Sequence, residues 1–259
     1  MSTQITTEQI KELRDATGIS VMQCKHALEE AEGDMKKALA ILKKTSSDIA
    51  LKKVNREVKD GRVSIKVEND KAVLVSLHCE TDFVAKNEDF AALLETLANK
   101  ALEEGVESMR ASAKEIIDPI IQKTGENIQL GDVYEIKGDV LGTYVHNNKT
   151  GVIVSLEGGN TELARDIAMH ITAMKPEYIT DAEITDDAKK TMQEIFEKEV
   201  ASVDKPAEIK KKMLDGKMAT YFKEKTLINQ AFIKDGEMTV GKLLEKNNAK
   251  IKEVKVYSI

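Results

Sequence analysis

The spacing of apolar residues predicts three short helices in the first 44 residues. The first begins at a capping box that starts with Thr6. The second is expected over residues 21–32, with Gly33 as its C-cap, and the third begins after the capping residue Asp34. Three helices in so short a segment form a marginal core. The pattern is therefore typical of a docking module rather than of an enzyme.

A change of periodicity after this module predicts a β-hairpin. Residues 45–61 are polar and charged, which indicates a linker that is partly helical. Apolar and polar residues then alternate over 63–67 and again over 71–77, on either side of a turn at 68–70. The linker and the hairpin together indicate that a new domain begins near residue 56.

Helical spacing returns after a predicted loop at 78–86. Apolar positions from Phe90 to Ala101 fall on one helical face. A further helical stretch is expected over about 107–124, where Pro119 should break the helix or begin a new one. A β-rich region, 128–157, comes next.

The sequence contains a faint internal repeat. The segment Ala72–Leu77 closely matches Gly151–Leu156, and each precedes a helix, the second with apolar positions from Leu163 to Met174. Coincidence between two apolar strands is the alternative. We interpret the repeat as two related α+β subdomains.

The last third of the chain predicts a helical hairpin and a closing strand. Residues 181–227 carry heavy charge and a thin apolar seam, which favours two antiparallel helices that project from the body. A short helix capped by Thr239 and a strand over 251–257 follow. We therefore predict an α+β protein with four parts: a three-helix module (1–55), a first core subdomain (56–139), a second core subdomain (140–180 and 228–259) and the hairpin (181–227).

Composition narrows the classes of function. The chain has 39 basic and 45 acidic residues and a net charge of −6, which argues against nucleic acid as the main ligand. The first residues lack the apolar region of a signal peptide, and no apolar run reaches the roughly 18 residues of a membrane helix. Two cysteines without a disulfide pattern favour a reducing compartment. We expect a cytoplasmic protein that is neither exported nor inserted into a membrane.

The candidates for catalysis are weak. Residues 236–243 nearly match a phosphate-binding loop, but Leu243 stands where a Ser or Thr must hold Mg²⁺. His78 and Cys79 are adjacent on a strand and point to opposite faces, so they cannot form a nucleophile–base pair. The four histidines are scattered, without the spacing of a metal site. We expect no catalytic centre, no metal and no cofactor, while a Cys79 hydrolase and a nucleotide binder remain the rival classes.

The segment Thr81-Asp82-Phe83-Val84 is the strongest candidate for recognition. It places an acidic residue beside one of only five phenylalanines, between a buried strand and a helix. Two interpretations stay open at this point. Phe83 packs back onto the core, or it points outward as an apolar anchor for a partner with Asp82 beside it as a charged group.

Two long motifs in the sequence resemble bacterial elongation factor Ts. The first is Leu13-Arg-Asp-Ala-Thr-Gly-Ile-Ser-Val-Met-Gln-Cys-Lys-His-Ala-Leu28, and the second is Cys79-Glu-Thr-Asp-Phe-Val-Ala-Lys86. Shorter stretches agree as well, among them Thr124-Gly-Glu-Asn127 and Gly138-Asp-Val-Leu-Gly-Thr-Tyr144. The resemblance covers essentially the whole chain.

The resemblance implies a non-catalytic guanine-nucleotide exchange factor whose protein partner is elongation factor Tu. It also implies an N-terminal module like the ubiquitin-associated (UBA) domain and a coiled-coil hairpin. Carried over to this sequence, Thr81–Val84 would displace the partner's Mg²⁺, with Asp82 and Phe83 inserted between its helices. Further contacts would come from Arg14, Val21, Met22 and His146.

The sequence departs from the family pattern at two places. Gln230-Ala231-Phe232 replaces a frequent Gln-Pro-Phe, so a contact there is not implied with the same force. Many members carry one more helix beyond the position that corresponds to Ile259.

Overall fold

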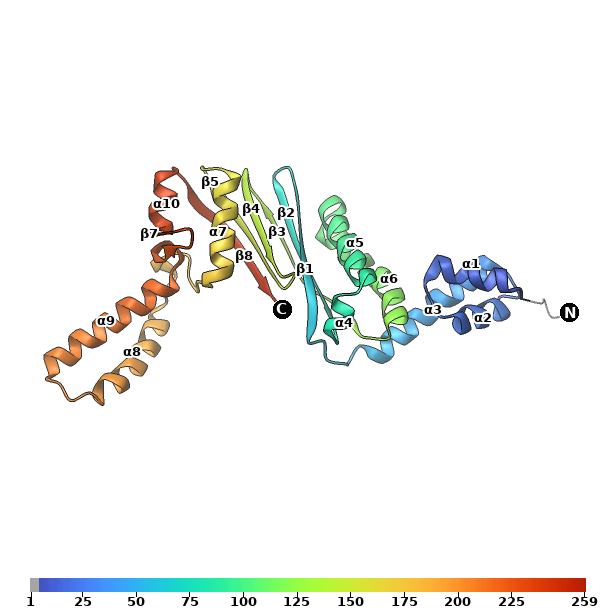
Figure 1. Ribbon diagram of the computed structural model, residues 1–259, viewed down its shortest axis with the longest axis horizontal. Coiled ribbons are helices and arrows are strands. Elements are labelled where there is room, and N and C mark those ends of the chain that lie inside the picture. Colours follow the sequence, from blue (N-terminus) through green and yellow to red (C-terminus); the bar gives the residue numbers. More distant parts are fainter. Residues whose placement is uncertain (1–4) are drawn as a thin grey trace. The chain divides into compact units, whose positions relative to one another are not determined.

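The computed structural model of the protein describes residues 5–259 (Figure 1). Contacts between residues divide it into two compact units. The first contains the chain up to Ile136 together with Val145–Gly151 and Val256–Ile259, and the second contains Lys137–Tyr144 and Val152–Lys255. Helices and antiparallel sheets share the chain, so the predicted α+β class is confirmed. None of the helices in the described part is long and apolar enough to cross a membrane.

Three helices form the N-terminal module, as predicted: α1 (Thr7–Thr17), α2 (Val21–Glu30) and α3 (Met35–Lys53). They bury a small core of their own that includes Leu13, Cys24 and Leu28. The capping box at Thr6 is present. The predicted extent of the second helix is wrong, because Glu32 has a φ of 53°, a value that ends a right-handed helix. The similarity of this module to a UBA domain stays a prediction.

The linker is partly helical, as predicted, because the third helix continues through its first half to Lys53. The second half of α3 packs along α6 (Val106–Thr124). Buried Ser46 bonds to Gln122, and Ser47 Oγ donates to Asp118 Oδ2 at 2.7 Å. Ile49 and Ala50 also pack on the first core, but the polar contacts of Ser46 and Ser47 leave no continuous apolar stripe that marks the helix in the sequence.

Pro119 neither breaks α6 nor begins a new helix, which corrects the sequence prediction. A proline inside a helix costs about 3 kcal/mol locally. Ala113, Ile117 and Ile121 of α6 are buried in the first core on both sides of the proline. This tertiary packing keeps the helix continuous.

The first unit is built on a three-stranded sheet in the order β1-β2-β3, formed by β1 (Asp60–Glu68), β2 (Lys71–Cys79) and β3 (Ile128–Lys137). The predicted hairpin is confirmed, with Glu68 opposite Lys71 in an antiparallel register. One helical turn, α4 (Asp82–Ala85), and the helix α5 (Glu88–Glu104) follow β2. The α5 side chains pack on the sheet around Phe90, which is fully buried.

The second sheet has the order β4-β5-β8, from β4 (Val140–His146), β5 (Thr150–Glu157) and β8 (Lys250–Ser258). The helix α7 (Thr161–Met174) packs against it closely, since a Cβ on Gly142 would lie 2.1 Å from the carbonyl carbon of Ala164. The repeated segments occupy β2 and β5, the central strands of the two sheets, and both are buried throughout. The two copies of the internal repeat thus occupy equivalent positions, the central strand of each sheet.

Two long helices, α8 (Asp186–Ala201) and α9 (Ala207–Lys225), form the predicted hairpin (Figure 1). Phe196 and Tyr221 contact each other edge to face across it. Short elements complete the second unit: η1 (Asp181–Glu183), η2 (Leu227–Asn229), β6 (Ala231–Phe232), β7 (Asp235–Thr239) and α10 (Val240–Lys246).

Candidate functional site

The candidate segment belongs to a one-turn helix, α4 (Asp82–Ala85), rather than to the predicted loop. Thr81 is its N-cap, and its hydroxyl accepts a bond from the Val84 N–H at 3.4 Å. Residues two apart on a helix point to nearly opposite sides. Ala85 is buried and Val84 packs partly on the core, while Phe83 is 82% exposed. The structure therefore excludes the interpretation that Phe83 packs onto the core, and the role of the exposed ring as an anchor stays a prediction.

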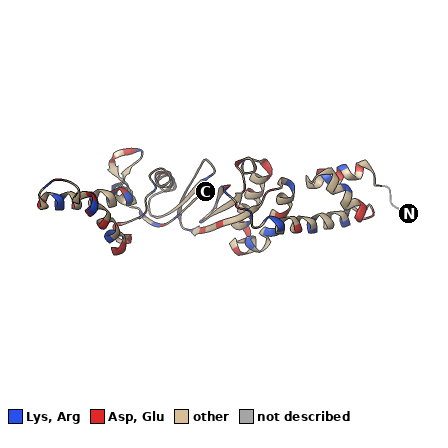
Figure 2. Cartoon of the chain, turned by 90° about the horizontal axis from the view of Figure 1, so that it is seen from below, with Lys and Arg blue, Asp and Glu red and all other residues tan. Residues whose placement is uncertain are grey.

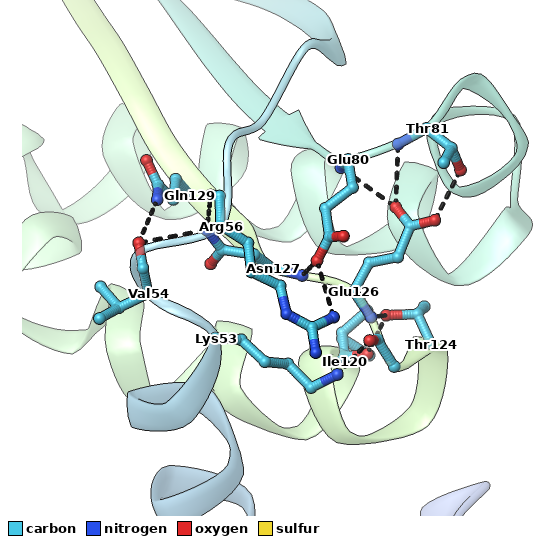
Figure 3. Close-up of polar contacts among 11 residues, drawn as sticks. Lys53, Val54, Arg56, Glu80, Thr81, Ile120, Thr124, Glu126, Asn127 and Gln129 are labelled. Carbon is cyan, nitrogen blue, oxygen red and sulfur yellow. Dashed lines mark hydrogen bonds and ion pairs between the residues drawn. The ribbon is translucent and has the colours of Figure 1, made fainter.

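A carboxylate from another part of the first unit supports this turn (Figure 3). Glu126 Oε2 accepts bonds from the backbone N–H groups of Glu80, at 3.1 Å, and Thr81, at 3.0 Å. Its other oxygen accepts the Thr81 hydroxyl at 2.6 Å. The base of the turn is thus fixed by three bonds to one charged group, and such bonds are stronger than neutral ones.

Asp82 lies beside Phe83 on the exposed side of the turn. Its Oδ2 is 2.7 Å from Lys86 Nζ, one helical turn further along, and both side chains are exposed. The bond to Asp82 raises the pKa of Lys86 above its usual value. An exposed pair of this kind contributes little to stability, so Asp82 can exchange Lys86 for another cation at small cost.

The other predicted contact residues lie elsewhere in the first unit. Val21 and Met22 begin α2 and are 49% and 57% exposed, and Arg14 is exposed in the last turn of α1. His146 is exposed at the end of β4, where the Asn147 side-chain amide lies 3.2 Å from its Nε2. The structure thus brings Val21 and Met22 together, whereas the turn and His146 belong to separate elements. Their roles in binding stay predictions.

The thiol of Cys79 has the wrong properties for a nucleophile. It is fully buried and donates to the Thr81 carbonyl oxygen at 3.1 Å. Burial, with a smaller contribution from the Glu126 charge, raises its pKa to about 12. A nucleophilic cysteine needs the thiolate form near neutral pH. His78 instead contacts the Tyr257 hydroxyl at 2.7 Å, on the other face of the strand.

Residues 236–243 have an ordinary structural role. They form strand β7 and the start of α10, whose N-cap Thr239 accepts from the Lys242 N–H at 3.3 Å. Within residues 5–259, no group of three or more His, Cys, Asp or Glu side chains could hold a metal ion. Phe232, in the Gln-Ala-Phe segment, is buried and packs near His170, so its ring is not available at the surface.

Sequence reasoning missed the part played by Glu126. The stretch 124–127 was noted only as part of a resemblance, and no periodicity or spacing pointed to it. The one local signal was Gly125, which ends α6 in a left-handed conformation with a φ of 77° and turns the chain toward the next strand. The contact that matters joins residues 45 positions apart.

Comparisons with a family model and with known proteins agree with one another. The family model described as Elongation factor TS matches residues 80–259. Elongation factor Ts of Hahella chejuensis is 39% identical over 262 residues, which cover 98% of this chain and 92% of the relative. The protein of the same name from Thioalkalivibrio sulfidiphilus is 38% identical, with coverages of 98% and 92%, and that from Pseudomonas fluorescens strain Pf-5 is 38% identical, with 96% and 88%. These matches place the chain among the translation elongation factors. It belongs to the elongation factor Ts family.

Proposed function

We propose that this chain is a guanine-nucleotide exchange factor for elongation factor Tu. It binds the GDP-bound partner, displaces Mg²⁺ and promotes release of GDP, so that GTP can bind. It acts in the cytoplasm through protein–protein contacts, without a cofactor, a nucleic acid or a small-molecule substrate of its own. The observation that supports this most directly is the ring of Phe83, exposed on a rigid turn with Asp82 beside it.

The chemistry of a GTPase explains why such a turn is useful. The nucleotide is held by a phosphate cradle and by Mg²⁺. An apolar ring inserted between helices beside that site moves the groups that hold the metal, and a carboxylate offers a competing charge. Asp82 is suited to this because its ion pair with Lys86 is exposed and easily exchanged.

One ring cannot supply all the energy that exchange needs. Shifting a population from 99:1 to 1:99 takes about 5.5 kcal/mol of differential binding. Burial of one phenylalanine contributes about 1.5–3 kcal/mol. The remainder requires a wider surface, and exposed Val21 and Met22 on the N-terminal module are suited to provide part of it. Coupling between the two binding sites is reciprocal. The exchange factor therefore lowers the affinity of elongation factor Tu for GDP by the same ratio by which GDP lowers its affinity for the exchange factor.

The test is release of a fluorescent GDP analogue from elongation factor Tu in a stopped-flow instrument, with excess unlabelled GDP as the trap. Added chain should accelerate release in a concentration-dependent way that saturates. Met22→Ala should raise the concentration needed for half-saturation. Release at the spontaneous rate, at concentrations where complex formation is verified, would refute the proposal.

We also propose that the chain has no enzymatic activity. The buried Cys79 thiol and the P-loop-like segment within β7 and α10 support this. Equilibrium dialysis of the isolated chain with labelled GDP or GTP distinguishes the classes. An exchange factor binds neither nucleotide by itself, whereas a nucleotide-binding enzyme would retain one of them.

A further inference from the structure

We propose that Glu126 is a positioning residue for exchange, because its carboxylate fastens the base of the Phe83 turn in the orientation that presents the ring. This inference rests on the proposed exchange function. It assigns no contact with the partner to Glu126. The residue acts through Thr81 and Phe83.

The first observation is that Glu126 bonds to the chain immediately before the turn. α4 is only four residues long, too short to be stable alone. The carboxylate accepts two N–H groups just before the turn and also the hydroxyl of its N-cap residue. Without these bonds, the turn keeps its Thr81 cap and the packing of Val84 and Ala85, but its base is no longer held.

The second observation is that Glu126 is itself held firmly. It follows the end of α6, and its backbone N–H bonds to the Thr124 hydroxyl at 3.4 Å. The next residue, Asn127, donates its backbone N–H to Glu80 Oε1 at 2.6 Å. Each glutamate side chain thus accepts a backbone N–H of the other chain segment: Glu126 accepts that of Glu80, and Glu80 accepts that of Asn127 (Figure 3).

The third observation is that the segment around Glu126 also bonds to the chain that follows α3. The Asn127 side-chain amide donates to the Arg56 carbonyl oxygen at 2.7 Å, and Gln129 donates to that of Val54 at 3.1 Å. Lys53 donates to the Gly125 carbonyl oxygen. Residues 125–129 therefore fasten the Phe83 turn and the end of α3 to one point, which fixes the turn against rigid elements.

The geometry predicts an order among substitutions of Glu126. In Glu126→Gln the amide oxygen can still accept the two N–H groups, and the NH₂ group can donate to Thr81 Oγ1. Glu126→Asp keeps the charge but withdraws it by about 1.5 Å, the length of one C–C bond, which is too far for bonds of this kind. Glu126→Ala removes every bond. We expect exchange to fall about tenfold for the Ala and Asp variants and less than about threefold for Gln.

The decisive experiment is a double-mutant cycle of Glu126→Ala and Phe83→Ala, with release of fluorescent GDP from elongation factor Tu as the readout. If Glu126 acts through the ring, its loss has less than about a twofold effect in the Phe83→Ala background. An unchanged tenfold effect in that background would overturn the proposal, and so would a wild-type rate in Glu126→Ala alone.

The matched control is Glu103→Ala, which removes an exposed glutamate on α5 and should leave the rate of GDP release unchanged. If the Ala variant does not fold, Glu126→Asp takes its place in the cycle.

A measurement without the partner separates this inference from the proposed function. Hydrogen exchange of the free protein should show faster exchange of the Glu80 and Thr81 amides in Glu126→Ala, with the amides in the middle of β2 unchanged. Unchanged protection at Glu80 and Thr81 would refute the positioning role. If wild-type chain fails to release GDP while these amides respond as expected, the exchange function is wrong and the structural role of Glu126 stands.

Discussion

Truncation of Phe83 tests the proposed function most sharply, because the structure predicts opposite effects on folding and on exchange. The ring is 82% exposed, so Phe83→Ala removes little buried area. Substitutions at such positions change the free energy of unfolding by less than about 0.5 kcal/mol. The same exposure means that nearly the whole ring is available for burial in a partner. Its burial there is worth about 1.5–3 kcal/mol, which corresponds to a loss of about 10- to 150-fold in exchange.

Stopped-flow release of fluorescent GDP measures the exchange, and thermal unfolding measures the stability. Val67→Ala removes an exposed apolar side chain at the end of β1 and is the matched control, with no expected effect on release. Phe90→Ala provides the contrast, since this ring is fully buried and its loss should destabilise the fold by about 3–5 kcal/mol. A folded Phe83→Ala protein that releases GDP at the wild-type rate would contradict the reasoning.

Three further predictions concern the fold. Gly142→Ala should destabilise the second unit by about 1–3 kcal/mol in denaturant titrations, because the new Cβ meets the α7 backbone. Burial lowers the pKa of His170 below its usual 6.5, so this side chain binds a proton more readily in the unfolded chain than in the folded chain. The free energy of unfolding should therefore fall as the pH drops from 7.5 to 5.5, and it should fall less steeply in His170→Gln. Both cysteines are buried, so a colourimetric thiol reagent at pH 8 should detect no thiol in the native protein and two after denaturation, whereas rapid native labelling of Cys79 would contradict the packing.

Local pattern was enough to predict most of the elements. Alternation identified the hairpin of β1 and β2, and the match between residues 72–77 and 151–156 identified the two central strands. These features depend on residues that are close in sequence. Side chains alternate between the two faces of a strand, so the pattern of apolar residues alone reveals them. The heavy charge and thin apolar seam of residues 181–227 likewise predicted the α8–α9 hairpin.

Apart from the end of the second helix, the failures share one physical cause, which is that long-range contacts decided the local structure. The end of α3 is stabilised by polar bonds to Gln122 and Asp118 on α6, and α6 runs through Pro119 because its flanks are buried. The turn α4 is capped by Thr81, and Glu126 bonds to the chain at its base. None of these partners lies within 40 positions of the segment that it stabilises, except for the flanks of Pro119. The exposure of Phe83 could not be predicted for the same reason.

A rigid support for an exposed ring has a consequence for the energetics of exchange. A flexible loop that becomes ordered on binding spends about 1–2 kcal/mol for each residue whose backbone is fixed. For a four-residue turn, this cost would exceed the gain of about 1.5–3 kcal/mol from burying the ring. In the free chain the turn is already capped by Thr81 and bonded to Glu126, so the cost is met during folding. In the proposed exchange, the ring can therefore contribute its burial energy to displacing the nucleotide, because the Thr81 cap, the packing of Ala85 and the bonds to Glu126 have ordered the turn beforehand.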